Sequence, residues 1–220
     1  MTTRLGNDAP LVGSAERAYQ HTKRAIIRGD LAPGAMISEG QIADELGISR
    51  TPVHEAFLRL AVEELLTLAS RKGAVVRPIS PHESLDVIEM REAIEAAAAA
   101  RVISAGHGAE VAPALTVLLE KQAEALAAAD FDGFVEADDD FHTAVVVASR
   151  NPIAVTFTRQ LWDRQQRLRH QLFRGAPQEM KTGFEQHRQL AAALADGDVA
   201  RYRQVLAEHV AVQRAELGAL

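Results

Sequence analysis

Four residues in the second half of the chain have the types and spacing of a metal site. Asp138 and His142 are four positions apart, so in a helix their side chains lie on one face and can bind one ion. His187 and His209 stand in two later segments. The apolar residues around each histidine indicate that the face of the segment that carries it is turned inward. Three imidazoles and one carboxylate suit zinc, nickel, iron or manganese, with coordination positions left open. Spacing alone, however, favours buried histidines satisfied by hydrogen bonds, beside a solvated acidic run at 138–140.

A second group of residues, nearer the N-terminus, could read DNA. Ser49, Arg50 and Thr51 follow a glycine and open a predicted helix, and an arginine with two hydroxyls at that place can reach base edges in the major groove. Arg71 and Lys72 lie at the tip of a predicted hairpin, where they could contact phosphate or the minor groove. For any single residue the structural alternative is the commoner one: Ser49 as a helix cap, Arg50 solvated.

Composition limits the classes of protein that these residues could serve. The chain of 220 residues has no cysteine, which excludes disulfides, thiolate metal sites and cysteine nucleophiles. The formal charge of -6 argues against nucleic acid at first sight, but residues 1–80 carry +1 and residues 81–220 carry -7. The N-terminal ten residues are polar, and no apolar run approaches the length of a membrane span. We expect a cytoplasmic protein that does not contact membranes.

The N-terminal elements form a recognisable order. Helical spacing of apolar residues predicts a first helix, Ser38 with Gln41 caps a short second helix that ends at Gly47, and Ser49 caps a third. Two short apolar runs joined by a tight basic turn predict a hairpin. The expected helices are 15–28, 39–46 and 50–65, and the expected strands are 65–69 and 74–76. Three helices with a glycine turn, closed by a basic hairpin, predict a winged helix-turn-helix over residues 1–77.

The remainder of the chain is predicted to be helical. Prolines at 78 and 81 mark a linker over 78–81. Beyond it, amphipathic segments separated by glycine, proline and asparagine predict six helices, at 82–105, 110–129, 132–149, 152–174, 178–195 and 198–217. Six antiparallel helices over 82–220 would form a bundle with a core large enough for a ligand site. The predicted fold class is therefore mainly α, a winged helix-turn-helix followed by an antiparallel all-helical bundle.

The N-terminal motif resembles the GntR family of bacterial regulators over residues 15–77. The resemblance is carried by residues 26–34, residues 42–53 and a glycine in the wing. It implies that Arg50, Thr51 and Gly73 fall on DNA-contact positions of the family. We assign these three to DNA binding, together with Ser49, His54, Arg71 and Lys72.

Three departures from the family pattern bear on how the operator is read. Gly40 and His54 stand where the family often has arginines, so direct readout by arginine depends here on Arg50. Glu64 replaces a glycine that usually precedes the wing. We expect Glu64 to lengthen the third helix slightly without affecting readout.

The second half of the chain is similar to the ligand-binding FCD domain of the FadR branch of this family. Residues 134–151, then His187, Gly197-Asp198 and His209, carry the resemblance. In the metal-binding members of that branch one aspartate and three histidines form the site. The resemblance thus implies a divalent transition metal, zinc first and otherwise nickel, iron or manganese, held by Asp138, His142, His187 and His209.

The resemblance also points to an effector site beside the metal. Arg91 falls where the family often keeps an arginine that points into the effector pocket, and we assign Asn151 to the same site. A solvent ion pair between Arg91 and Glu95 is an equal alternative. We expect Asp139 and Asp140 to face solvent, and the remaining histidines to be surface or packing residues: His21, His82, His107 and His170.

The function that these patterns favour is ligand-controlled transcription regulation. We expect a homodimeric regulator, a repressor, that binds a double-stranded DNA operator and is controlled by a small carboxylate effector. A metal-dependent hydrolase with an accessory N-terminal domain is the main alternative, although no HExxH or paired ExxH motif supplies its general base. A third possibility is a C-terminal module that only dimerises.

Overall fold

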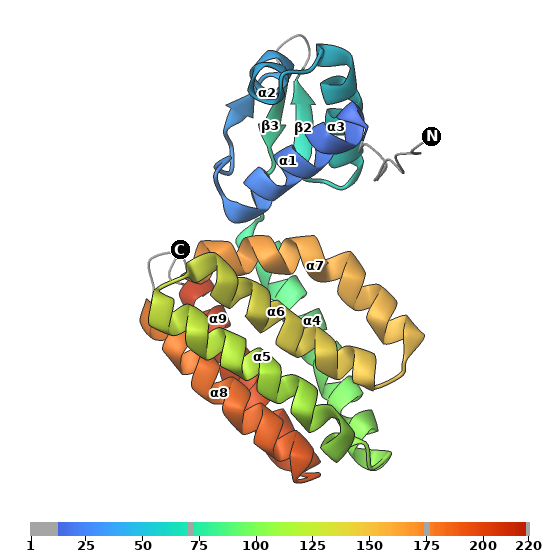
Figure 1. Ribbon diagram of the computed structural model, residues 1–220, viewed down its shortest axis with the longest axis vertical. Helices are drawn as coiled ribbons and strands as arrows, with labels where there is room; N and C mark the ends of the chain where they lie inside the picture. Colours follow the sequence, from blue (N-terminus) through green and yellow to red (C-terminus); the bar gives the residue numbers. More distant parts are fainter. Residues whose placement is uncertain (1–12, 70–72, 174–176, 219–220) are drawn as a thin grey trace, which may run out of the picture. The chain divides into compact units, whose positions relative to one another are not determined.

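The computed structural model describes residues 13–69, 73–173 and 177–218, and its contacts divide the chain into two compact units, Met1–Pro78 and Ile79–Leu220 (Figure 1). Within these described residues the first unit has three helices and a small sheet, and the second has six helices. The predicted fold class is confirmed. The finer division into 1–77, a linker at 78–81 and 82–220 remains a prediction.

Three helices build the N-terminal unit around one core. They are α1 (Ser14–Arg28), α2 (Glu39–Leu46) and α3 (Arg50–Val62). The Ser38 hydroxyl accepts a hydrogen bond from the Gln41 backbone N–H at 3.0 Å, which is the cap that the sequence predicts for α2. The fully buried side chains of Val53, Phe57 and Leu60 turn one face of α3 into this core. The opposite face of α3 is thereby left for another partner.

The wing is a three-stranded antiparallel sheet in the order β1-β3-β2. β2 (Leu66–Ala69) and β3 (Gly73–Val76) are the predicted hairpin, whereas β1 (Met36–Ile37) was not predicted because two residues show no alternation. Gly73 has a φ of +103°, and a Cβ there would lie 2.1 Å from the Ile37 carbonyl oxygen. Only glycine lets β3 approach β1 at this position.

Glu64 does not lengthen α3, so that prediction was wrong. The helix ends at Val62, and Glu64 has a φ of 61°, in the left-handed region. It thus takes the backbone conformation that glycine adopts at low cost and other residues do not. Its carboxylate lies 2.9 Å from Arg77 in an exposed ion pair, which offsets little of that cost.

Six helices form the C-terminal unit, each within two residues of its predicted bounds. They are α4 (Pro81–Ser104), α5 (Gly108–Ala128), α6 (Phe131–Ala148), α7 (Pro152–Phe173), α8 (Pro177–Ala195) and α9 (Val199–Gly218). α5 packs between α6 and α8, while α4 packs against α9, α6 and α7. None of the helices within the described ranges is long and apolar enough to cross a membrane.

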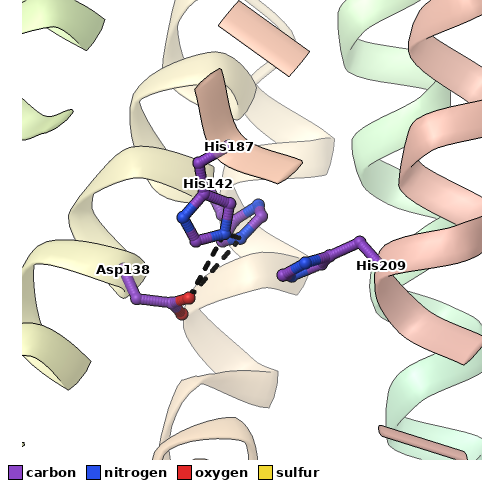
Figure 2. Close-up of side chains that lie close together, drawn as sticks. All are labelled: Asp138, His142, His187 and His209. Atoms are coloured by element: carbon purple, nitrogen blue, oxygen red, sulfur yellow. Dashed lines mark hydrogen bonds and ion pairs between the residues drawn. The ribbon is translucent and has the colours of Figure 1, made fainter. Parts of the chain in front are cut away.

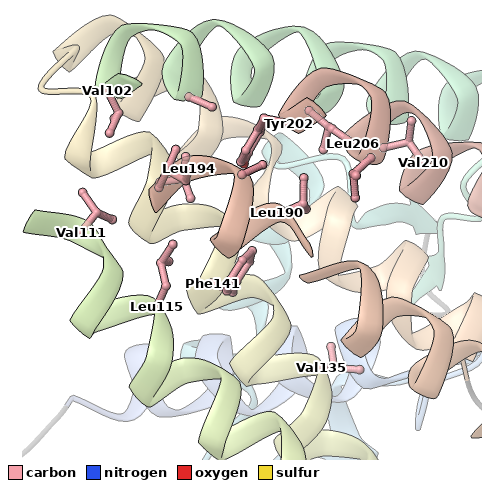
Figure 3. Packing of buried hydrophobic residues seen from close by; sticks show 14 of the residues in the cluster. Val102, Val111, Leu115, Val135, Phe141, Leu190, Leu194, Tyr202, Leu206 and Val210 are labelled. Carbon is pink, nitrogen blue, oxygen red and sulfur yellow. The ribbon is translucent and has the colours of Figure 1, made fainter. Parts of the chain in front are cut away.

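The core of this unit lies among α4, α5, α6, α8 and α9 (Figure 3), and α7 adds the buried side chain of Leu168. Phe141, Leu190 and Leu206 are fully buried there. The Phe141 ring stacks on the His187 ring with centroids 4.8 Å apart. The apolar core therefore reaches the histidines directly and keeps water away from them.

Candidate metal centre and nucleic-acid interface

The four residues predicted as metal ligands lie together inside the helical bundle (Figure 2). α6 contributes Asp138 and His142, α8 contributes His187, and α9 contributes His209. All four are at most 3% exposed, and their candidate ligand atoms lie within 4.8 Å of one another. We refer to these residues as the four-ligand cluster.

The donor atoms of the cluster converge on one point. The Nε2 atoms of His142 and His187 are 3.0 Å apart, and the Asp138 Oδ1 lies 3.3 Å from the His187 Nε2 and 4.0 Å from the His142 Nε2. These separations are those expected of ligands around one small cation.

Each histidine turns its other ring nitrogen towards an oxygen. His187 Nδ1 donates to Gln122 Oε1 at 2.8 Å, and His209 Nδ1 donates to Gln186 Oε1 at 2.9 Å. His142 Nδ1 lies 2.8 Å from Glu95 Oε2, an ion-pair distance at an angle outside that of a good hydrogen bond. Such partners set the tautomer and orientation of metal-binding histidines.

Gln122 fixes the proton of His187 unambiguously. Its amide nitrogen donates to the Ala137 carbonyl at 3.2 Å, so its oxygen is the atom that faces His187. His187 therefore carries its proton on Nδ1. The Glu95 carboxylate, 2.8 Å from His142 Nδ1, favours a proton on that nitrogen by its charge, without a well-aligned hydrogen bond. Two Nε2 lone pairs thus face each other across 3.0 Å, an arrangement that a cation between them would stabilise.

Burial keeps the three histidines neutral. Desolvation lowers the pKa of His187 to about 4, with Asp138 opposing the shift. Burial, followed by Arg91, lowers the pKa of His142 well below its usual value, and burial, followed by His187, does the same for His209. Neutral imidazoles are the form that binds metals.

Asp138 is ionised despite its burial. Desolvation alone would raise its pKa, but Arg169 and then His187 and His142 outweigh it, and the pKa falls to about 2. Arg169 Nε lies 2.6 Å from Asp138 Oδ2, which leaves Oδ1 turned towards the histidines. Arg169 comes from α7 and is 2% exposed, and nothing in the sequence pattern had marked it.

Arg91 lies in the site and not in solvent. It is 3% exposed, with its Nε 2.7 Å from Glu95 Oε1 and its Nη2 3.3 Å from His209 Nε2. The ion pair with Glu95 foreseen as the alternative exists, but it is buried and adjoins the four-ligand cluster. The expected ion pair in solvent is thus a buried one, and a role for Arg91 in effector binding remains a prediction.

The expectation that Asp139 faces solvent was wrong. Asp139 is 7% exposed, its Oδ1 lies 2.6 Å from Arg169 Nη1, and its other oxygen accepts from the Trp162 indole N–H. α7 covers this face of α6, so two successive aspartates share one arginine. Asp140 is exposed as expected.

The other predicted effector residue, Asn151, caps a helix. Its Oδ1 accepts from the Ile153 and Ala154 backbone N–H groups at 3.1 and 3.4 Å, at the start of α7. This contact explains an asparagine before Pro152 without a ligand. A role for Asn151 in effector binding remains a prediction.

The remaining histidines have the surface and packing environments expected of them. His21 and His82 are exposed beside Glu45 and Asp86, His107 occupies the N-cap position of α5, and His170 packs edge-on against Phe131.

A surface hollow of about 400 Å³ between α5 and α6 is lined by four carboxylates and one lysine: Glu124, Asp130, Glu136, Asp140 and Lys121. Its acidic lining disfavours an anionic effector.

The predicted DNA-contact residues form an exposed surface on α3. Ser49, Arg50, Thr51 and His54 are all exposed, and we call these four the reading surface. Ser49 occupies the N-cap position but makes no side-chain capping hydrogen bond, so its cap role is confined to the backbone. Arg71 and Lys72 lie outside the described residues, and Gly73 has the structural role described above.

A winged helix-turn-helix followed by an all-helical domain with a buried polar cluster defines a DNA-binding transcription regulator that responds to a small molecule. Residues 14–76 match the family of bacterial regulatory proteins named gntR, and residues 86–212 match the FCD domain. The chain belongs to the GntR family of bacterial regulatory proteins, in the branch that carries an FCD domain.

Individual relatives agree with this assignment. An uncharacterized HTH-type transcriptional regulator of Agrobacterium vitis, from the TAR-I ttuE-ttuC' intergenic region, is 34% identical over 151 residues, 68% of this chain and 88% of the relative. The HTH-type transcriptional repressor RspR of Escherichia coli is 28% identical over 196 residues, 89% of this chain and 85% of the relative. The solved structure of E. coli McbR/YncC is 27% identical with a TM-score of 0.77, covering 95% of this chain and 99% of that one.

The chain is a regulator and not an enzyme, so the hydrolase alternative is not favoured.

Proposed function

We propose that this regulator is a homodimeric repressor controlled by a small carboxylate effector, which binds at a divalent transition metal in the FCD domain. Asp138, His142, His187 and His209 would hold the metal. Zinc is the first candidate, and nickel, iron and manganese accept the same donors. When bound, the ion would supply a Lewis-acidic centre with positions open to a carboxylate oxygen.

The observation that carries this proposal is the orientation of the three imidazoles. All three Nδ1 atoms face oxygen atoms, on Glu95, Gln122 and Gln186. The Nε2 atoms of His142 and His187 lie 4.0 and 3.3 Å from Asp138 Oδ1, and that of His209 lies 3.3 Å from Arg91 Nη2. Without a cation, one of the two Nε2 atoms 3.0 Å apart would have to carry a proton, and the oxygens that face both Nδ1 atoms favour the proton there instead. The donor set therefore fits a cation.

The charge balance around the cluster supports an anionic effector. Two buried guanidiniums, on Arg91 and Arg169, are linked by contacts of 2.6 to 2.7 Å to three buried carboxylates, on Glu95, Asp138 and Asp139. With neutral histidines this group carries one net negative charge, and a divalent ion makes it one net positive charge. Because charge is costly in a buried site, a carboxylate would neutralise the metal-loaded group.

Buried polar atoms near the cluster support the same conclusion. Among the described residues, the Tyr202 hydroxyl and the Arg169 Nη2 are buried without a hydrogen-bond partner. The nearby Glu95 carboxylate, after burial itself, raises the pKa of Tyr202, so the hydroxyl stays a donor. A hydroxy- or dicarboxylic acid on the metal could accept from both groups.

The repressor role is proposed from the relatives and from the reading surface. The named repressor RspR aligns with most of this chain. Ser49, Arg50, Thr51 and His54 offer hydroxyl, guanidinium and imidazole groups to base edges. Two such units in a homodimer would read a palindromic operator.

Titration of small hydroxy- and dicarboxylic acids into the metal-loaded protein tests the proposal. We expect these acids to raise the melting temperature and to change operator affinity measured by fluorescence anisotropy. Arg91→Ala and His187→Ala should blunt both effects, whereas Arg101→Ala, an exposed arginine on the same helix, should leave them unchanged. If the acids stabilise metal-free His187→Ala as strongly as the parent, the effector does not bind at the metal.

A further inference from the structure

The first turn of α2 contacts the reading surface at two points. A Cβ on Gly40 would lie 3.3 Å from Arg50 Nη2 and 3.5 Å from both Arg50 Cζ and Nε. Three atoms of the guanidinium are thus nearly equidistant from that position, so the guanidinium lies across the bare face of Gly40. A methyl group at residue 40 would meet the guanidinium at a slightly tight contact and shift it by a few tenths of an ångström, and a longer side chain would displace it.

The second contact joins the neighbouring residue of α2 to the next turn of α3. His54 Nδ1 lies 2.7 Å from Glu39 Oε1. The carboxylate can only accept, so the imidazole donates from Nδ1 and its Nε2 is the other available edge. Both side chains are partly exposed, His54 at 54% and Glu39 at 30%, so this imidazole remains open to a partner.

Arg50 and His54 are one helical turn apart on the same face of α3. Four residues of helix rise by about 6 Å, close to two base-pair steps of about 3.4 Å each. Two side chains so placed can reach different base pairs along the groove. Gly40 therefore lies beside Arg50, and Glu39 contacts His54. Arg50 and His54 are the two side chains that could read two different base pairs.

We propose that Gly40 and Glu39 are positioning residues that set the base preference of the reading surface. Gly40 provides the place on which the Arg50 guanidinium lies, and Arg50 in that pose reads guanine through its N7 and O6 acceptors. Glu39 fixes the proton on His54 Nδ1. The Nε2 of the neutral ring then accepts, which selects a base that offers a major-groove donor, adenine or cytosine. This inference rests on the proposed role of α3 as the reading helix.

The test is selection of bound sequences from a randomised double-stranded DNA library by the full-length protein, followed by affinity measurements at each specified position. Gly40→Ala should weaken the preference at the Arg50 position by roughly threefold to tenfold, and by less than Arg50→Ala does. Because alanine is the better helix former, the melting temperature should stay the same or rise. Gln41→Ala is the matched control, since that exposed side chain contacts Glu45 of its own helix, and it should leave the preference unchanged.

Glu39→Gln tests the second contact. An amide can also donate, so it releases the constraint on the His54 tautomer and should broaden the preference at one position only, the position that His54→Ala abolishes. If Gly40→Ala shows the parent's base preference at every position, the role proposed for Gly40 is wrong. If Glu39→Gln keeps the parent's base preferences while His54→Ala changes them, the role proposed for Glu39 is wrong. An Arg50→Ala protein that discriminates as the parent does would instead refute α3 as the reading helix.

Discussion

The four-ligand cluster and the reading surface use charged and polar side chains in opposite environments. Around the cluster, Arg91, Arg169, Asp138 and Glu95 are all less than 5% exposed, and each lies in contact with a charged neighbour. On the reading surface, the His54 side chain is 54% exposed, and its partner, Glu39 of α2, is 30% exposed.

This difference separates stability from recognition. Removing a buried charge leaves its partner unpaired in a medium of low polarity, which destabilises the fold strongly. Removing an exposed charge costs little stability but deletes a contact that DNA would make. Substitutions of the buried charges around the cluster should thus act on folding and ligand binding together, and those on the reading surface on DNA binding alone.

The largest expected effect is that of Arg169→Ala, which would leave Asp138 and Asp139 buried without their shared partner. We expect a loss of about 3 to 5 kcal/mol in the free energy of unfolding, measured by urea denaturation. Arg188→Ala breaks an ion pair with Glu185 that is 60% and 55% exposed, and should change the stability by less than about 1 kcal/mol. Equal effects of the two substitutions would abolish the distinction between buried and exposed charges.

Acidification should destabilise the metal-free protein through its histidines. The pKa of His187 is about 4 in the folded chain and about 6.5 when unfolded, so between these values the unfolded chain binds the extra proton. Stability should be intact above pH 6.5 and fall as the pH drops towards 4, by about 2 kcal/mol from this residue alone at pH 5.

Melting curves of the chelator-treated protein across this range check the prediction. His187→Gln should flatten the dependence on pH, whereas His82→Gln, whose side chain is 89% exposed, should keep it. A dependence on pH that is the same in His187→Gln as in the parent would mean that the buried histidine does not titrate in this window.

On the reading surface, Arg50→Ala should reduce discrimination between operator and random DNA without unfolding the protein. A bidentate contact to guanine is worth about 1 to 3 kcal/mol of discrimination, and the side chain is exposed. The measurement is anisotropy on both DNAs at one fixed salt concentration, with a melting curve of each protein. A large fall in melting temperature would place Arg50 with the structural residues instead.

The smallest expected effect concerns the strained residue before the wing. Glu64→Gly should raise the free energy of unfolding by about 0.5 to 1 kcal/mol, because glycine adopts the positive φ of 61° without steric cost. Glu64→Ala loses the same carboxylate and keeps the strain, so it should not stabilise the protein. A gain in both variants would trace the effect to the ion pair with Arg77.

The sequence predicted those parts of the fold that follow from periodicity. The helices and the hairpin follow from apolar spacing and caps, and Asp138 and His142 from their separation by four residues. β1 was missed because two residues are too few to show an alternating pattern. The positive φ of Glu64 was missed because the sequence at the end of a helix does not show which residue must take a left-handed backbone conformation.

The surroundings of the cluster were harder to predict, although two signals were present. Gln122 stands in the apolar stripe of α5, between Leu115 and Ala125, and Glu95 stands in that of α4; a polar residue on an apolar face indicates a buried contact. Arg169 carried no such signal. Its helix α7 is rich in arginine, and its partner Asp139 belongs to an acidic run that looks solvated until α7 covers it.

Metal binding by the four-ligand cluster is tested most directly by adding zinc to the metal-depleted protein while metal content and melting temperature are both measured. We expect about one ion per subunit and a higher melting temperature, because binding to the folded state alone stabilises it. His187→Gln should lose both responses, and His82→Gln should keep both. A parent protein that binds no zinc, nickel or manganese and gains no thermal stability from any of them would contradict the metal site.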